Sequence, residues 1–289
     1  GGFGFCWRVV LQRDREAVRG TSGGGTSRSA VAAGARGAFA DAQRHAAAAT
    51  ALTGGAGNDT LDGGAGSDAL EGGDGIDTAS YESATSGVTV SLISTGSNED
   101  TFSSIENLTG SNYADTLTGE THSNLLRSLD GNDILIGYGG GDVFEGGEGT
   151  DTVSYAWVNA NTGVLASLAD QNANAGGATG DTYSSIEKLI GSDGNDTLIG
   201  DSNASGNTLD GGAGSDLLVD GGGASADIYI GGTGSDVISY ANASAAVTLA
   251  LTGGTSGDAA GDVYTSIENV VGSSFDDSIE GDAGDNTLY

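Results

Sequence analysis

The chain has 289 residues, of which 54 are glycine, none is proline or methionine, and one is cysteine. Its 40 acidic residues outnumber 9 basic ones, which gives a net charge of −31. This charge excludes nucleic acid and anionic membrane surfaces as favourable partners, and one cysteine excludes an internal disulfide framework. No apolar run approaches the roughly 18 residues of a membrane span. Because glycine is costly to order, the chain needs either disorder or an external source of folding energy.

Residues 1–50 differ from the rest in charge and carry no repeat. They hold seven arginines against three acidic residues, whereas residues 51–289 hold two basic residues against 37 acidic ones. We expect a boundary near Thr50, with residues 1–50 forming an Arg/Ala/Gly-rich linker or disordered segment outside the domain at 51–289.

A nine-residue unit recurs from Gly54 onward, with the pattern G-G-x-G-x-D-x-U-x, in which U is apolar. The first three units read GGAGNDTLD, GGAGSDALE and GGDGIDTAS. Two longer blocks follow, and a final pair of units closes the chain. An apolar residue at U in all fifteen units is hard to obtain by chance. The aspartates of the units, our candidate metal ligands, are Asp59, Asp68, Asp77, Asp115, Asp133, Asp142, Asp151, Asp196, Asp216, Asp227, Asp236 and Asp277.

The spacing predicts how each unit folds. The glycines permit a tight turn, and x-U-x forms a short strand whose apolar side chain points inward. Two units make one coil of about eighteen residues, and stacked coils build two facing parallel sheets. The sequence therefore predicts an all-β fold, a right-handed parallel β-roll or β-helix solenoid.

The interior of such a roll is too thin to offset the cost of ordering the chain. Turns eighteen residues apart lie on the same side of the roll, so Asp59 stacks beside Asp77, and Asp133 lies between Asp115 and Asp151. Because Ca²⁺ takes six to eight oxygen ligands from carboxylates and carbonyls, we expect several Ca²⁺ ions between stacked turns.

The repeats resemble the RTX, or haemolysin-type, repeats of toxins, metalloproteases, lipases, epimerases and adhesins that Gram-negative bacteria export. The resemblance covers residues 54–289. It implies a calcium-loaded parallel β-roll, passage through a type I secretion machinery, and folding on extracellular calcium. It therefore implies a secreted, extracellular location.

A longer unit also recurs three times. Ser-Tyr ends a block of nonapeptides, an alternating stretch such as GVTVSL follows, and then a segment such as Ser104-Ile105-Glu106-Asn107-Leu108. We interpret these units as wider β-coils inserted at about residues 82–108, 156–189 and 241–270. They serve either as spacers that keep the stack continuous or as a surface that contacts a ligand.

Three units depart from the pattern, because Asn124, Asn207 and Asn286 replace the aspartate. Loss of a carboxylate lowers the local charge, so we expect these sites to be weaker or empty. The last unit ends at Tyr289 without the polar cap that solenoids need, so we expect the chain to belong to a longer parent protein.

No catalytic motif stands out. His45 and His122 are the only histidines, and no H-E-x-x-H zinc motif is present. We therefore expect not an enzyme but a calcium-binding structural and secretion scaffold. The alternative is an adhesin or carbohydrate-binding segment that contacts a glycan or cell-surface ligand. A third possibility is part of an extracellular protease, lipase or epimerase whose catalytic domain lies elsewhere in the parent.

Overall fold

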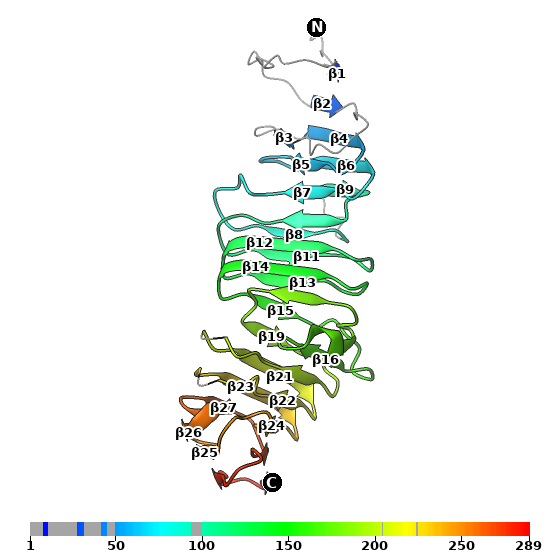
Figure 1. The fold of residues 1–289 in the computed structure, drawn as a ribbon. Helices are drawn as coiled ribbons and strands as arrows, with labels where there is room; N and C mark the ends of the chain where they lie inside the picture. Colours follow the sequence, from blue (N-terminus) through cyan, green and yellow to red (C-terminus); the bar gives the residue numbers. More distant parts are fainter. Residues whose placement is uncertain are drawn as a thin grey trace.

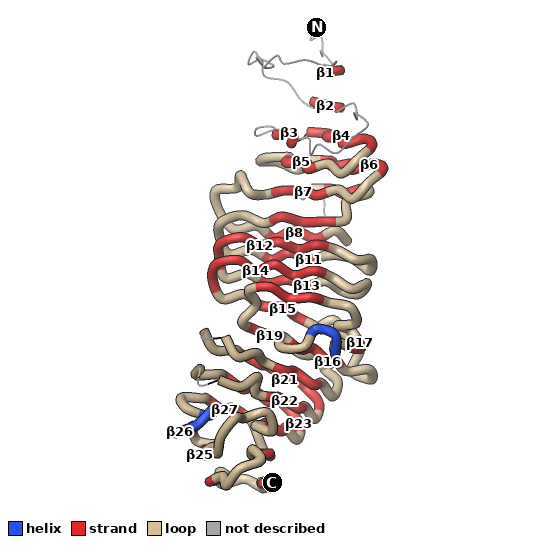
Figure 2. Tube along the Cα trace, viewed as in Figure 1, coloured by secondary structure: helices blue, strands red, loops and turns tan. Residues whose placement is uncertain are grey.

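The computed structural model is an elongated stack of short strands, with the N-terminal strands at one end and the C-terminus at the other (Figure 1). It describes residues 8–10, 28–31, 42–44, 50–93, 100–203, 205–223 and 225–289. Within these ranges helix is confined to two short 3-10 turns, η1 (Gln171–Ala173) and η2 (Gly257–Ala259) (Figure 2). None of the described helices is long and apolar enough to cross a membrane.

One nonapeptide forms one turn and one short strand, as predicted. In β5 (Thr60–Asp62), Leu61 is fully buried while its two neighbours are half-exposed. This strand pairs in parallel with β7 (Thr78–Ser80), and Thr60 lies opposite Thr78, eighteen residues further on. In the third block the offset is twenty residues, with Thr197 opposite Leu217, because insertions lengthen each coil. Two nonapeptides therefore make one coil, and the fold is a parallel β-roll.

Five sheets follow one another along the roll, and we name them A to E. Sheet A contains β1 (Arg8–Val10), β2 (Arg28–Val31), β4 (Thr50–Ala56), β6 (Ala69–Asp74) and β9 (Thr101–Ser103). Sheet B contains β3 (Ala42–Arg44), β5, β7, β10 (Asn107–Thr109), β12 (Leu125–Gly131), β14 (Val143–Gly149) and β18 (Thr182–Ser184).

The remaining sheets have the same construction, and only β16–β17 and β25–β26 pair antiparallel among the described strands. Sheet C contains β8 (Thr89–Ser91), β11 (Thr116–Thr118), β13 (Ile134–Ile136), β15 (Thr152–Ser154), β19 (Lys188–Ile190), β21 (Thr208–Gly214), β23 (Ile228–Gly234) and β27 (Val263–Thr265). Sheet D contains β17 (Ala175–Gly176), β16 (Val164–Ser167), β20 (Thr197–Ile199), β22 (Leu217–Val219), β24 (Val237–Ser239), β28 (Asn269–Val271) and β30 (Thr287–Leu288). Sheet E contains β26 (Gly253–Ser256), β25 (Thr248–Ala250) and β29 (Ser278–Glu280).

Each wider coil exchanges one sheet for another, which the sequence analysis did not predict. In the first coil, β8 begins sheet C, β9 ends sheet A, and β10 continues sheet B. The second coil begins sheet D with β16, ends sheet B with β18 and continues sheet C with β19. The third begins sheet E with β25, ends sheet C with β27 and continues sheet D with β28. At each wider coil, one of the two facing sheets therefore ends and is replaced by a new sheet, while the other continues.

The sheets begin upstream of the boundary that we predicted near Thr50. Strand β2 pairs in parallel with β4, and β3 pairs with β5 at an offset of eighteen residues. A parallel ladder needs only extended backbone at the spacing of one coil, so a segment without the repeat motif can join it. Most of residues 1–50 lie outside the described residues, so the division at residue 50 stays a prediction.

The core is a narrow line of side chains from the U positions and their counterparts in the wider coils. Thirteen of the fifteen predicted U residues, from Leu61 to Ile238, are buried. Ile279 is partly buried and Leu288 is 41% exposed, because both lie in the last strands of their sheets. The wider coils add buried tyrosines, among them Tyr155 and Tyr240.

Candidate metal centres

The aspartates of successive coils stand in columns along the turns. The Oδ1 atom of one aspartate accepts a hydrogen bond from the backbone N–H of the aspartate one coil earlier, as between Asp77 and Asp59 at 2.7 Å. Asp133 lies between Asp115 and Asp151, with bonds of 2.6 Å and 2.9 Å, in the arrangement that the eighteen-residue spacing predicts. Each column is thus a line of buried carboxylates whose first oxygen is held by the backbone.

The second oxygen, Oδ2, divides these aspartates into groups. In the first group it is buried and accepts no hydrogen bond within the part of the chain that the structure describes. A buried carboxylate without a compensating partner costs several kcal/mol when it is ionised. This group consists of Asp77, Asp133, Asp142, Asp151, Asp216 and Asp236, which we call the open aspartates.

Burial changes the acidity of the open aspartates. It is the largest cause that raises the pKa of Asp142, Asp151 and Asp216 to about 7 each, and neighbouring carboxylates add to the shift. The pKa values of Asp77, Asp133 and Asp236 are raised for the same first reason. In the absence of a cation, burial therefore shifts these side chains toward the protonated form, whereas a bound cation would favour the carboxylate.

Glycine lets neighbouring coils approach closely beside the open aspartates. A Cβ atom added to Gly211 would lie 2.3 Å from Oδ2 of Asp216 and 2.8 Å from the carbonyl oxygen of Gly231 in the next coil. The carboxylate of one coil and a carbonyl of its neighbour thus lie close to the same glycine. Carboxylate and carbonyl oxygens are the ligands that Ca²⁺ prefers. No group of three His, Cys, Asp or Glu side chains converges among the described residues, so such a site would depend on backbone oxygens.

Serine satisfies a second group of predicted ligands, namely Asp115, Asp196 and Asp277. In Asp115, Oδ2 accepts a 2.5 Å bond from the backbone N–H of Ser111, and Oδ1 accepts a 2.8 Å bond from its hydroxyl. Ser192 and Ser273 hold the other two aspartates in the same way. Both oxygens of these carboxylates already have donors, so they depend less on a cation.

A tyrosine hydroxyl donates a hydrogen bond to one further predicted ligand, Asp227. Asp227 accepts bonds from the backbone N–H of Asn207 and from the hydroxyl of Tyr229. The remaining two predicted ligands stand in the columns as well, since Asp59 donates its backbone N–H to Asp77 and Asp68 donates to Oδ1 of Asp100 at 2.7 Å. The assignment of all twelve aspartates as metal ligands stays a prediction.

Six acidic residues of the wider coils occupy column positions that the sequence analysis missed. Three of them are aspartates whose Oδ1 atoms accept hydrogen bonds from the backbone N–H groups of repeat aspartates: Asp100 from Asp68, Asp181 from Asp142, and Asp262 from Asp227. Glu106, Glu187 and Glu268 accept from Asp77, Asp151 and Asp236. A signal was available, because an aspartate stands six residues before each of these glutamates, in DTFSSIE, DTYSSIE and DVYTSIE.

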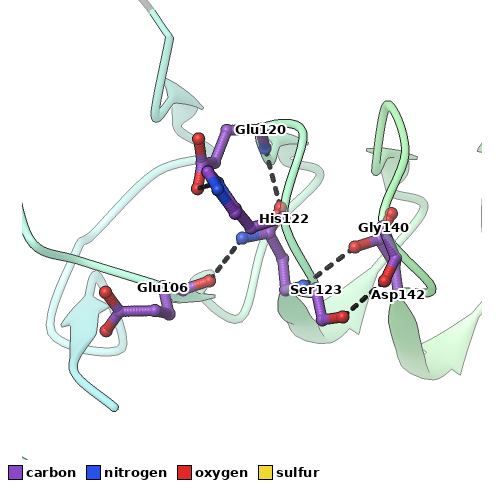
Figure 3. Close-up of polar contacts among 7 residues, drawn as sticks. Glu106, Glu120, His122, Ser123, Gly140 and Asp142 are labelled. Atoms are coloured by element: carbon purple, nitrogen blue, oxygen red, sulfur yellow. Dashed lines mark hydrogen bonds and ion pairs between the residues drawn. The ribbon is translucent and has the colours of Figure 1, made fainter. Parts of the chain in front are cut away.

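In the turn that carries Asn124 an amide stands where most other turns have a carboxylate; Figure 3 shows its surroundings, with Glu106, Glu120, His122 and Ser123 labelled. Asn124 Oδ1 accepts from the backbone N–H of Glu120, and Nδ2 donates to the carbonyl oxygen of Glu106 at 2.7 Å. His122 is exposed and contacts Glu120 at 2.6 Å, while Ser123 donates to the carbonyl of Gly140. Asn286 likewise donates to the carbonyl of Glu268. This geometry agrees with weak or empty sites at the asparagines, which remains a prediction.

Comparison with known protein families matches the model described as the RTX calcium-binding nonapeptide repeat (4 copies) to this chain. The matched residues are 49–79, 118–153, 181–218, 201–238 and 265–289. These ranges cover more than half of the chain and contain all six open aspartates. None of the curated proteins matches the sequence.

Proposed function

Because the chain belongs to the RTX calcium-binding nonapeptide repeat family, we propose that it is a module of an exported protein that folds around Ca²⁺ outside the cell. In this role the module is a structural and secretion scaffold, and the predicted ligands are the open aspartates together with carbonyl oxygens of the adjacent coils. Any catalytic activity would belong to another part of the parent protein.

The open aspartates carry this proposal. Six buried carboxylates, each with an oxygen that accepts no hydrogen bond in the described residues, are the feature that most needs a cation. Extracellular modules bind Ca²⁺ with dissociation constants of about 10⁻⁴–10⁻³ M. At ten times such a concentration each site would contribute about 1.4 kcal/mol to stability, so several sites together would contribute several kcal/mol.

The composition supports export in an unfolded state. At a net charge of −31 the chain repels itself, and its 54 glycines favour the disordered form until a cation compensates both costs. A cell interior with little free Ca²⁺ would then keep the chain unfolded for passage through a type I system. Extracellular Ca²⁺ would fold it on arrival.

Circular dichroism tests the proposal directly. With chelator, we expect a largely disordered spectrum; with millimolar Ca²⁺, we expect a strong β signal. Equal concentrations of Mg²⁺ are the control, because Mg²⁺ demands a smaller octahedral site and gives up its water reluctantly. A fully folded chain in chelator would refute calcium-driven folding.

A further inference from the structure

The contact between a nonapeptide block and the wider coil after it involves the same three residue types in all three blocks. An open aspartate ends the block, and a serine and a glutamate from the wider coil lie against it one coil further on. We call these sets the junction triads: Asp77–Ser104–Glu106, Asp151–Ser185–Glu187 and Asp236–Ser266–Glu268.

The carbonyl oxygen of each triad serine lies close to the same glycine as the Oδ2 atom of the triad aspartate. Ser104, Ser185 and Ser266 have φ angles of 50°, 52° and 53°, which only a few per cent of non-glycine residues adopt. A Cβ atom added to Gly72 would lie 1.9 Å from the carbonyl oxygen of Ser104 and 2.4 Å from Oδ2 of Asp77. A Cβ atom added to Gly146 would lie 2.0 Å from the carbonyl oxygen of Ser185 and 2.5 Å from Oδ2 of Asp151. At Gly231 the distances are 2.0 Å to the carbonyl oxygen of Ser266 and 2.6 Å to Oδ2 of Asp236.

The same pair of oxygens is present in the ordinary nonapeptide turns. At Gly211, the carbonyl of Gly231 and Oδ2 of Asp216 take these places, at 2.8 Å and 2.3 Å. The serine carbonyl of the wider coil therefore substitutes for the glycine carbonyl of a nonapeptide, although the wider coil lacks the G-G-x-G motif there.

The glutamate adds a second carboxylate. Oε2 of Glu106, Glu187 and Glu268 accepts from the backbone N–H of the triad aspartate at 2.8, 2.9 and 2.9 Å. Each triad aspartate is 0% exposed, and its Oδ2 accepts no hydrogen bond within the described ranges. Lys188, next to Glu187, lies 3.9 Å from Asp210 instead. An unpaired buried oxygen thus faces a carbonyl beside a second carboxylate.

We propose that Glu106, Glu187 and Glu268 are calcium ligands, and that each junction triad is a Ca²⁺ site that joins a nonapeptide block to the wider coil after it. The proposal rests on the proposed function, because it requires that the roll binds Ca²⁺. It goes further in assigning sites to coils that lack the repeat motif. Two carboxylates and a carbonyl are a donor set of the kind that Ca²⁺ accepts.

The test removes the charge of the glutamates and keeps their shape. Glu106→Gln, Glu187→Gln and Glu268→Gln are made singly and together, since glutamine can still accept from the aspartate N–H. The control chain carries Glu71→Gln, Glu82→Gln and Glu280→Gln, which remove the same charge from exposed side chains. Bound Ca²⁺ per chain is measured by equilibrium dialysis at the free concentration that saturates nine tenths of the wild-type sites, and folding by circular dichroism.

We expect each single variant to bind one ion fewer and the triple variant three fewer, with the control chain unchanged. If the triple variant does not fold, the single variants decide, and each should lack the one ion of its own site. Wild-type stoichiometry and an unchanged folding midpoint in all three single variants would refute the calcium sites at the junction triads and leave the proposed function standing. A wild-type chain that binds no Ca²⁺ would overturn the proposed function itself.

Discussion

The hydroxyl of Tyr155 donates to Oδ2 of Asp181 at 2.6 Å, so that this buried carboxylate has a donor on both of its oxygens. Tyr81 and Tyr240 bond to Asp100 and Asp262 in the same way in the other two wider coils. In the open aspartates the corresponding oxygen has no such donor. Tyrosine therefore ends a column of carboxylates without requiring a cation.

Replacing Tyr155 by phenylalanine should destabilise the calcium-loaded roll by about 1–3 kcal/mol, because it leaves a buried carboxylate oxygen of Asp181 without its donor. Urea denaturation at saturating Ca²⁺ measures the effect. Tyr113→Phe is the control, since Tyr113 is 48% exposed. Equal stability of the two variants would contradict the role that we assign to the tyrosine.

Asp133→Asn and Asp115→Asn should separate calcium binding from turn stability. Asp133 is open and lies between two coils, so its loss should lower the calcium stoichiometry by one or two ions. Asp115 is held by Ser111, so its replacement should weaken the turn but leave the stoichiometry unchanged. Calorimetric titration counts the ions, and thermal denaturation reports the stability. The same number of ions lost in both variants would show that serine does not take the place of the cation.

Gly146→Ala should block a junction site by its size alone. The new methyl group would lie 2.0 Å from the carbonyl of Ser185 and 2.5 Å from Oδ2 of Asp151, so the coils must separate. Overpacking of this kind typically costs about 1–3 kcal/mol. Gly139→Ala is the matched control, because its nearest neighbour is an atom of Trp157 at 3.9 Å. We expect the calcium midpoint of folding, followed by circular dichroism, to rise for the first variant only.

Protons should stabilise the folded calcium-free chain in a defined pH range. Burial raises the pKa of Asp142, Asp151 and Asp216 to about 7, from a usual value of 3.8. Between these values the calcium-free folded chain binds more protons than the unfolded chain. Its free energy of unfolding therefore falls as the pH rises from about 4 to 7.

Protonation should therefore favour folding of the calcium-free chain, so its β signal in chelator should be stronger at pH 5 than at pH 8. Circular dichroism in chelator at the two pH values measures the difference. A β signal that does not change with pH would mean that burial does not raise the pKa of these aspartates in the calcium-free chain.

The sequence alone determined the repeating part of the molecule. The position of Leu61 in its nonapeptide predicts that it points inward, and the eighteen-residue spacing places Asp133 between Asp115 and Asp151. These features follow from local geometry, because a turn and a three-residue strand have fixed lengths and a parallel ladder repeats them in register. A periodic sequence is sufficient to predict them.

Only the tertiary structure decided which carboxylates have partners and where the sheets change. Tyr155 and Asp181 are 26 residues apart, and Asp151 and Glu187 are 36 apart, so neither pair has the eighteen-residue separation of neighbouring coils. The length of each wider coil brings them together, since the second coil starts sheet D at β16 and ends sheet B at β18 before β19 continues sheet C. Whether the Oδ2 atom of Asp181 meets a tyrosine depends on the coil beside it, which the period of the repeat does not give. The serine-held aspartates are different, because the sequence itself marks them: Ser111, Ser192 and Ser273 each stand four residues before their aspartate, in place of the second glycine of the motif.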